Sequence, residues 1–352
     1  MSSCAGKRNK RLQAGLTVLA AALIIALVSG PRGPIATARA AGPTAEVPYV
    51  VTALKITGAK EPVYVQSEGH GKLVFSDASG AVFSIPISGG PAIKVAKISR
   101  PGGLAIAPAN FGSYAGQIFV LSAAGKGGAC VIDRIDKSGK VSSFATLPKA
   151  GKIGKGEPTD CRDLEFGPAS GPFAGKLYAV ADGNATVYET GPDGKARVFS
   201  TLDKPIPWEI INLTFAPPDD PKARGAMMLG MRPRDETAAK VGRIGMLGAD
   251  GKLSANYYLV GFTRPTGWGF APAGFGEYHN QFFILDAGRT AKQSHGARDG
   301  EVLRFDKGVA RKFASGFVDP DCLRFVGNQM VIADPAGNGA RGGAILVIKS
   351  ML

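Results

Sequence analysis

The chain has 352 residues, of which 45% are apolar and 20% charged, with 49 glycines and 24 prolines. This composition predicts a globular protein with a large core and many turns, and it excludes a disordered chain. The net charge is +14, but residues 1–40 hold six basic residues and no acid, so +8 remains beyond them. A moderate positive charge favours anionic ligands and gives no reason to expect nucleic acid as a partner.

Residues 1–40 have the pattern of a secretory signal peptide. A basic segment at residues 7–11 precedes an apolar run at residues 14–29, and small residues suited to cleavage follow at 38–40. We expect cleavage and export to the periplasm, the cell surface or the medium, with an uncleaved membrane anchor as the alternative. No other segment is apolar enough to cross a membrane, so the mature chain, residues 41–352, should lack a stable membrane span.

Six short β-rich runs follow in chain order, each flanked by Gly, Pro, Asp and Ser as strands are. They are centred on Val74, Phe119, Tyr178, Met228, Phe283 and Val331. Two copies, residues 107–121 and 271–285, have nearly the same sequence, which we call the repeated phrase, and residues 166–180 hold a shortened copy of it. A period of roughly 45–60 residues is that of a four-stranded propeller blade, whereas helical patterning is absent.

The two ends of this repeat region complement each other. The last copy stops at its third strand, residues 344–348, while residues 49–56 form a strand without a repeat of its own. If that strand completes the sixth blade, the ring is closed by its own termini and leaves only short, protected sheet edges. We therefore predict an all-β fold, a six-bladed β-propeller in one domain at residues 41–352, and we expect a monomer.

Residues 61–65 open the first blade and residues 320–323 the sixth, and the strand pattern covers nearly the whole mature chain. The chain thereby resembles the six-bladed calcium-propeller superfamily, which includes gluconolactonase/senescence-marker-protein-like and NHL-repeat-like propellers. The lactonase resemblance implies a divalent metal, such as calcium, that polarises a lactone carbonyl. Its ligands would be Glu61, Asn212 and Asp321.

The resemblance departs from the lactonase motifs in three places. The Glu61 motif lacks a glycine and has Tyr64 in place of tryptophan, Asp321 falls in the sixth blade, and the fifth blade opens with Pro265 where an aspartate is expected. The metal set is therefore short of a ligand, and no cofactor is certain. Quinoprotein sugar dehydrogenases share the six-bladed plan but use a histidine base, and no histidine here begins an inner strand.

Long basic loops in blades four and five are expected on the face where the channel opens, which we call the top face. The candidate ligand-binding residues are Arg232, Arg234, Arg289, Lys292 and Arg298. Loops on a rigid scaffold often carry function, and arginines suit carboxylate, sulfate or phosphate. The leading hypothesis is an exported binding scaffold for an anionic small molecule, glycan or protein. The metal-dependent lactonase-like hydrolase is the alternative, and ordinary solvated charge is the simplest interpretation of the loops.

Three cysteines remain beyond the signal, which allows one disulfide and one thiol in an exported chain. Cys130 ends the blade-two loop and Cys161 precedes the first strand of blade three, so we predict a disulfide between them. Cys322 is then the unpaired thiol. No histidine is visible beside it in the sequence, so a nucleophilic role is not favoured.

Overall fold

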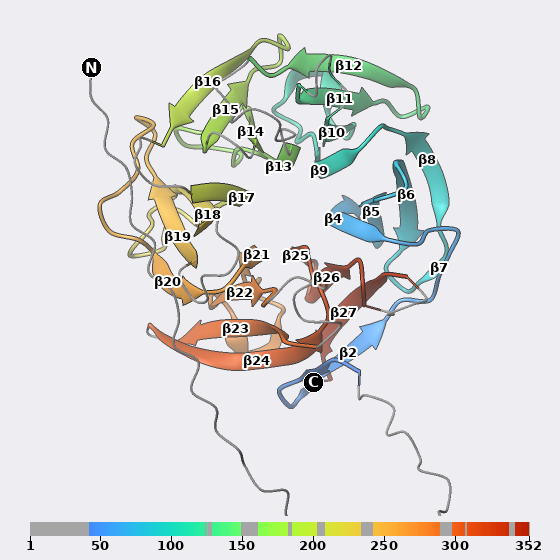
Figure 1. The fold of residues 1–352 in the computed structure, drawn as a ribbon, viewed down its shortest axis with the longest axis vertical. Helices are drawn as coiled ribbons and strands as arrows, with labels where there is room; N and C mark the ends of the chain where they lie inside the picture. The colour runs from blue at the N-terminus through green and yellow to red at the C-terminus, as the bar shows by residue number, and fades with distance from the viewer. Residues whose placement is uncertain are drawn as a thin grey trace, which may run out of the picture. The chain divides into compact units, whose positions relative to one another are not determined.

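The computed structural model describes residues 42–123, 125, 129–148, 161–181, 185–202, 208–233, 242–288, 298–306, 308–337 and 342–351. These residues form six antiparallel sheets, arranged as the blades of a propeller around a central axis (Figure 1). The predicted all-β, six-bladed fold is therefore confirmed. Each of the six repeat centres lies in the second strand of its blade.

The strands of each blade follow one another from the axis outward. Blades one to three are β4 (Pro62–Gly69), β5 (Lys72–Asp77), β6 (Ala81–Pro86) and β8 (Ile93–Lys97); β9 (Pro101–Ile106), β10 (Ile118–Ser122), β11 (Val131–Ile135) and β12 (Val141–Thr146); and β13 (Cys161–Phe166), β14 (Leu177–Ala181), β15 (Thr186–Thr190) and β16 (Ala196–Thr201). Blade four is β17 (Trp208–Phe215), β18 (Met227–Pro233), β19 (Gly242–Leu247) and β20 (Leu259–Phe262). Blade five begins with β21 (Pro265–Phe270), β22 (Phe282–Asp286), β23 (Gly300–Asp306) and β24 (Val309–Phe317). Blade six begins with β25 (Cys322–Val326), β26 (Gln329–Asp334) and β27 (Ala344–Ser350). A two-residue parallel pair, β3 (Ile56–Thr57) with β7 (Gly90–Pro91), lies beside blade one.

The middle strands are the most apolar because neighbouring blades cover both faces of each sheet. Every residue of β10, β14 and β22 is buried. The fourth strands lie at the rim, and β12 and β16 expose several residues each. The core is therefore distributed between the blades.

The N-terminal segment closes the ring, as the sequence predicts. Strand β2 (Tyr49–Ala53) is the fourth strand of blade six and pairs with β27, with Tyr49 opposite Ser350. Just before it, β1 (Thr44–Ala45) pairs with β24 and adds a fifth strand to blade five. One short segment thus adds the outermost strand to two blades, and only the short strands β1 and β2 are left as their outer edges, which limits pairing with other chains.

Tyr49 fixes this closing segment to blade five. Its ring is 4% exposed and lies 5.0 Å from the ring of Phe275 and 5.3 Å from that of Tyr278. Its hydroxyl donates a hydrogen bond to the carbonyl of Phe275 at 2.9 Å. Nearby, the Arg304 Nε donates to Glu46 Oε2 at 3.0 Å, and the guanidinium lies 4.3 Å from the Tyr278 ring centre.

The repeated phrase forms the turn between the first and second strands of blades two and five. In both copies a buried phenylalanine, Phe111 or Phe275, precedes a 3-10 turn, and the same backbone hydrogen bonds recur around it. Phe111 packs on Phe166 of the next blade at 4.7 Å, and Phe275 packs on Phe325 of the next blade at 5.1 Å. The phrase is therefore a packing unit between blades, on the face opposite the inner-strand starts.

Aspartates at the ends of second strands hold the chain that enters each blade. Asp77 accepts hydrogen bonds from the backbone amides of Lys60 and Glu61, both at 2.8 Å. Asp286 and Asp334 repeat this contact with the two residues at 263–264 and 318–319. The recurring terminal aspartate of the sequence pattern is thus a scaffold feature that satisfies amides before the first strand.

Replacing Tyr49 with alanine should lower the free energy of unfolding by about 3–5 kcal/mol, because it removes a large buried ring from the closing strand. Tyr49→Phe removes only the hydroxyl and should cost about 1 kcal/mol. Val47→Ala is the control, since Val47 is 81% exposed in the same segment. Urea unfolding measures all three, and an equal effect of Val47→Ala and Tyr49→Ala would contradict the closing role.

Candidate functional site at the axial mouth

The six inner strands begin at one end of the axis, which we call the mouth. Five of these strands have a register shift near their start: between Pro62 and Tyr64, Pro101 and Leu104, Cys161 and Asp163, Ile210 and Asn212, and Pro265 and Gly267. A β-bulge of this kind bends a strand and redirects its side chains, and bulges are common beside functional sites. The residues that follow the shifts occupy equivalent positions around the axis.

A chain of side-chain contacts around the axis joins each blade to the next. The Ser76 hydroxyl donates to Gly102 O at 3.2 Å, Leu213 N donates to Asp163 Oδ2 at 3.1 Å, Asn212 Nδ2 donates to Thr266 O at 3.2 Å, the Thr266 hydroxyl donates to Pro320 O at 2.8 Å, and the Cys322 thiol contacts Val65 O at 3.7 Å. Blades two and three are joined by the disulfide between Cys130 and Cys161. Six contacts therefore complete a circuit.

The close approach of neighbouring inner strands requires glycine at three positions, of which the first is Gly102, where a Cβ atom would lie 2.0 Å from the Cys161 carbonyl oxygen. A Cβ atom on Gly103 would lie 2.6 Å from the Cα of Asp163, and one on Gly267 would overlap the backbone of Leu323. The missing side chains let neighbouring inner strands come within reach of the circuit's hydrogen bonds.

Arg324 crosses the axis from blade six to blade three, which lies opposite in the ring (Figure 1). Its Nη2 lies 3.3 Å from Asp163 Oδ2 and 3.8 Å from Glu165 Oε2, and its Nη1 donates to the Leu323 carbonyl at 3.0 Å. Arg324 is 8% exposed and Asp163 is 0% exposed. One guanidinium therefore faces two carboxyls at the centre of the molecule.

Burial controls the ionisation of this cluster. It raises the pKa of the Glu165 carboxyl to about 7, against the opposing charge of Arg324 and with a further rise from Asp163. Burial also raises the pKa of Asp163, although Arg324 and the amide of Leu213 oppose it. Desolvation raises the pKa of the Tyr64 hydroxyl well above its usual range. Proton uptake near neutral pH is therefore a property of Glu165.

Asp321 and Arg162 carry charge at the mouth itself. Both are partly buried; Arg162 is the extra residue of the blade-three bulge and Asp321 precedes β25. Burial raises the pKa of Asp321 to about 6, while Arg264 lowers it, Asp319 raises it and Arg162 lowers it. The charges of Arg162 and Asp321 also act on the Tyr64 hydroxyl. A carboxyl and a guanidinium from opposite blades therefore both lie at the mouth.

The three predicted metal ligands differ in their surroundings. Glu61 is exposed before β4, Asn212 is 1% exposed in β17, and Asp321 lies at the mouth. Asn212 uses its Nδ2 in the circuit, while its buried Oδ1 has no hydrogen-bond partner among the described residues. Across the described ranges, no group of three or more His, Cys, Asp and Glu side chains is arranged to hold a metal. Binding of calcium or another divalent ion stays a prediction.

Two of the predicted ligand-binding residues have internal partners. Arg232 was expected in a loop but lies in β18, is 7% exposed and donates from Nε to Glu209 Oε2 at 2.6 Å. The strand extends further than its sequence suggests because Glu209 and Arg232 are cross-strand neighbours. Arg298 donates to Gly316 O at 3.0 Å and Gly337 O at 3.4 Å, bridging blades five and six. Arg234, Arg289 and Lys292 lie outside the described residues.

The cysteines follow the predicted pattern. The Cα atoms of Cys130 and Cys161 are 5.6 Å apart in their disulfide. Cys322 is free and fully buried in the circuit, and burial raises the pKa of its thiol. A raised thiol pKa opposes nucleophilic chemistry, because the thiolate is the reactive form.

The sequence interpretation did not single out Arg162, Asp163, Glu165 or Arg324. A signal for them exists: charged residues occur inside strands that the repeat period makes innermost, where apolar residues are the rule. That signal marks the individual residues. It does not indicate that Arg324 and Asp163 meet.

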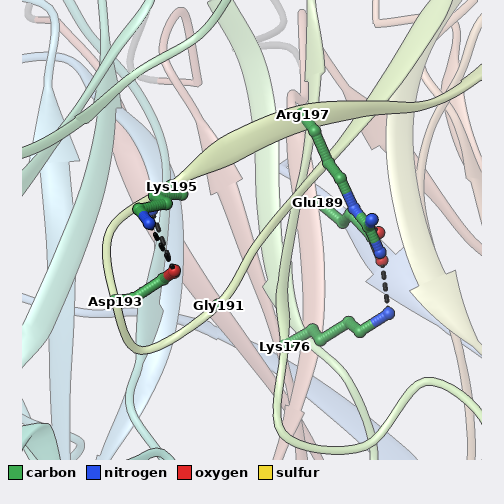
Figure 2. Close-up of a pocket in the computed structure, with 6 residues that line it drawn as sticks. All are labelled: Lys176, Glu189, Gly191, Asp193, Lys195 and Arg197. Carbon is green, nitrogen blue, oxygen red and sulfur yellow. Dashed lines mark hydrogen bonds and ion pairs between the residues drawn. The ribbon is translucent and has the colours of Figure 1, made fainter.

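A second polar feature lies on blade three, on the face opposite the mouth. A pocket of about 300 Å³ is lined by Lys176, Glu189, Gly191, Asp193, Lys195 and Arg197 (Figure 2). Figure 2 shows the Lys176 and Arg197 side chains converging on Glu189, with Lys195 directed toward Asp193 at the other side.

Comparisons with known proteins identify the fold only. No protein-family model matches the chain, and no curated protein matches it. Solved structures that resemble it include a gluconolactonase from Xanthomonas campestris, with 15% identity, a TM-score of 0.56, and coverage of 91% of this chain and 99% of that one. The soluble aldose sugar dehydrogenase from Escherichia coli gives 11% identity, a TM-score of 0.53, and coverage of 86% of this chain and 99% of that one. An auxiliary nutrient binding protein from Bacteroides thetaiotaomicron gives 10% identity, a TM-score of 0.55, and coverage of 85% of this chain and 76% of that one.

These neighbours are enzymes and a binding protein on one architecture. At such identities they show that the fold is shared, and function must be argued from the site. Within the described part of the chain, no helix has the length and apolar character needed to span a membrane.

Glu165→Gln should flatten the pH dependence of stability. The folded Glu165 carboxyl keeps a proton up to about pH 7, whereas the unfolded carboxyl, with an ordinary pKa of 4.5, has released it. The folded state therefore binds more protons, and rising pH between those values destabilises the wild type relative to the variant, by at most about 1.4 kcal/mol per pH unit. Urea unfolding from pH 4.5 to 8 measures this, and parallel stability curves for the two proteins would contradict it.

Proposed function

We propose that this chain is a ligand-binding β-propeller that holds a small anionic sugar or glycan unit at its mouth. The observation that carries the proposal is that Asp321 and Arg162 both lie at that end of the axis, beside the buried Arg324 cluster. An ionised carboxylate accepts hydrogen bonds from sugar hydroxyls, and a guanidinium binds a carboxylate or sulfate in two-point fashion. The mouth therefore offers both groups that an acidic sugar requires.

The basic top-face loops would supply a second layer of attraction. Arg234, Arg289 and Lys292 lie outside the described residues, but in the sequence they follow the second strands β18 and β22, which end at the mouth end of their blades. Arg232 and Arg298 would contribute through shape only, since Glu209 and two backbone carbonyls already occupy their guanidinium groups. Long-range charge of this kind accelerates capture of anions.

We also propose that the protein acts outside the cytoplasm. The signal-peptide pattern of residues 1–40 supports this, and so does the disulfide between Cys130 and Cys161, because disulfides persist in oxidising compartments. The names of the structural neighbours, which include a gluconolactonase, an aldose sugar dehydrogenase and a nutrient binding protein, support a sugar-related ligand.

Calorimetric titration with glucuronate, gluconate and a sulfated disaccharide should show saturable binding, with glucose weaker. Asp321→Asn and Arg162→Gln should each weaken binding by about tenfold or more, since each removes one charged hydrogen-bonding group. The triple change of Arg234, Arg289 and Lys292 to alanine should slow association and weaken its salt dependence. Lys94→Gln, on the exposed rim strand β8, is the control. No binding of any probe, or equal loss in Lys94→Gln, would refute the proposal.

A second candidate is the metal-dependent lactone hydrolase. The favouring observation is the buried Asn212 Oδ1, an acceptor without a partner in a position that resembles a lactonase ligand. Calcium and similar ions bind carboxylate and amide oxygens, and Glu61 and Asp321 would provide the carboxylates. A bound metal would polarise the lactone carbonyl.

Calcium titration of the melting temperature tests this candidate directly. Selective binding to the folded state raises the melting temperature by mass action, and Asn212→Leu or Glu61→Gln should remove the shift. Glu68→Gln, an exposed glutamate in the same blade, is the control. A melting temperature independent of calcium would eliminate the metal-dependent mechanism and leave the binding proposal standing.

A further inference from the structure

The blade-three pocket departs from the pattern of its repeat. In blades two and five the position opposite the second-strand phenylalanine is an arginine, Arg134 or Arg304. Each guanidinium lies over the tyrosine ring of the repeated phrase, at 5.0 Å for Tyr114 and 4.3 Å for Tyr278. An aromatic ring covers the charge there.

Blade three inverts this charge pattern. The equivalent third-strand residue is Glu189, which lies opposite Tyr178 and is 4% exposed. Lys176 takes the position held by glutamine in the two long copies of the phrase. The aromatic residue of the shortened phrase, Phe173, is buried against Tyr178 and Phe199, so it does not lie over the charges. A pocket of about 300 Å³ remains.

Glu189 holds the cationic groups of this pocket in place. Lys176 Nζ donates to Glu189 Oε2 at 2.6 Å, and Arg197 Nε donates to Glu189 Oε1. One carboxylate cannot neutralise two cations, so the cluster keeps a net positive charge. Among the described residues, no acceptor bonds the terminal Nη atoms of Arg197, and the Arg197 side chain is 72% exposed. A fixed guanidinium with free N–H groups is suited to bind an oxyanion without a large ordering cost.

Lys195 can add to this site. Its Nζ lies 4.0 Å from Asp193, and the two side chains are 86% and 57% exposed, so that ion pair is weak. Asp193 has a separate structural role, because its Oδ1 accepts a hydrogen bond from the Lys195 amide at 3.1 Å and shapes the turn. Lys195 can therefore turn from Asp193 to a ligand while the turn is maintained.

We propose that this pocket is an oxyanion-binding site, separate from the mouth, for a carboxylate or sulfate on a small polar ligand. Arg197 would bind the oxyanion through its terminal nitrogens, Lys176 and Lys195 would add charge, and Glu189 would position the two cations it contacts. Its volume lies at the small end of ligand sites, roughly 300–1,000 Å³, which fits one small acidic unit.

Blade four provides a matched control. Its turn between third and fourth strands repeats the blade-three turn: Lys252 N donates to Asp250 Oδ1 at 3.0 Å, and Lys252 Nζ lies 3.8 Å from Asp250. The corresponding third-strand residue, however, is Met246, opposite Met228, instead of a buried glutamate. Lys252→Gln therefore makes the same surface change without the cluster.

The test is NMR or calorimetric titration of the full-length protein with sulfate, glucuronate and glucose at low ionic strength. Sulfate and glucuronate should saturate the pocket and glucose should not. Lys195→Gln should weaken binding severalfold and Arg197→Gln by about tenfold or more. Lys252→Gln and the mouth variant Asp321→Asn should leave this event unchanged, which separates it from binding at the mouth.

Absence of saturable binding by either anion would overturn the inference, as would equal weakening by Lys195→Gln and Lys252→Gln. Because Arg197→Gln leaves Glu189 with one partner, its melting temperature is measured in parallel. Lys195→Gln, at an exposed turn, tests the site without that complication.

Discussion

The ion pair between Arg324 and Asp163 is the constraint on which the centre of this propeller depends. Two charges removed from water are costly unless each is paired and hydrogen-bonded. Arg324 bonds Asp163 and the Leu323 carbonyl, and Asp163 accepts the Leu213 amide as well. Because these residues belong to blades three, four and six, the two charges are paired only when those three blades are assembled. The pair therefore favours one arrangement of the blades over looser alternatives.

The circuit of contacts around the axis also favours one arrangement of the blades, but each of its contacts joins two neighbouring blades. Five of the contacts are single hydrogen bonds that each contribute little alone, and the sixth is the disulfide, which contributes more. Together they set the spacing of the inner strands, and glycine at positions 103 and 267 permits that spacing. Asn212 shows the cost of this arrangement: its amide group serves the circuit, and its carbonyl oxygen is left buried without a partner. The amide nitrogen of Asn212 therefore serves the structure, while its oxygen is the atom offered to a ligand.

Much of the fold could be predicted because its determinants are local and repeated. The short β-rich runs, the Gly, Pro, Asp and Ser residues that flank them, and the unmatched strand at residues 49–56 define blades, order and closure without any contact information. The site could be predicted only in part. The pairing of Arg324 with Asp163 joins opposite blades, and no local pattern encodes it. Arg232 was assigned to a loop because its partner Glu209 lies on the neighbouring strand, and the inverted charges of blade three become visible only when the strands are in register.

Closure by the N-terminal segment also determines the order in which the molecule can fold. The strand at Tyr49–Ala53 pairs with Ala344–Ser350, and nearly the whole ring lies between these two strands in the chain, so its partner is made long after it. Contacts between such distant residues form slowly, because a long loop must close before they contribute stability. Until then, β2 is an unpaired edge open to other chains. The short length of β2 and the exposed polar residue at Thr52 limit pairing of this edge with other chains. The segment that completes the native ring is therefore also the one that needs protection while the chain folds.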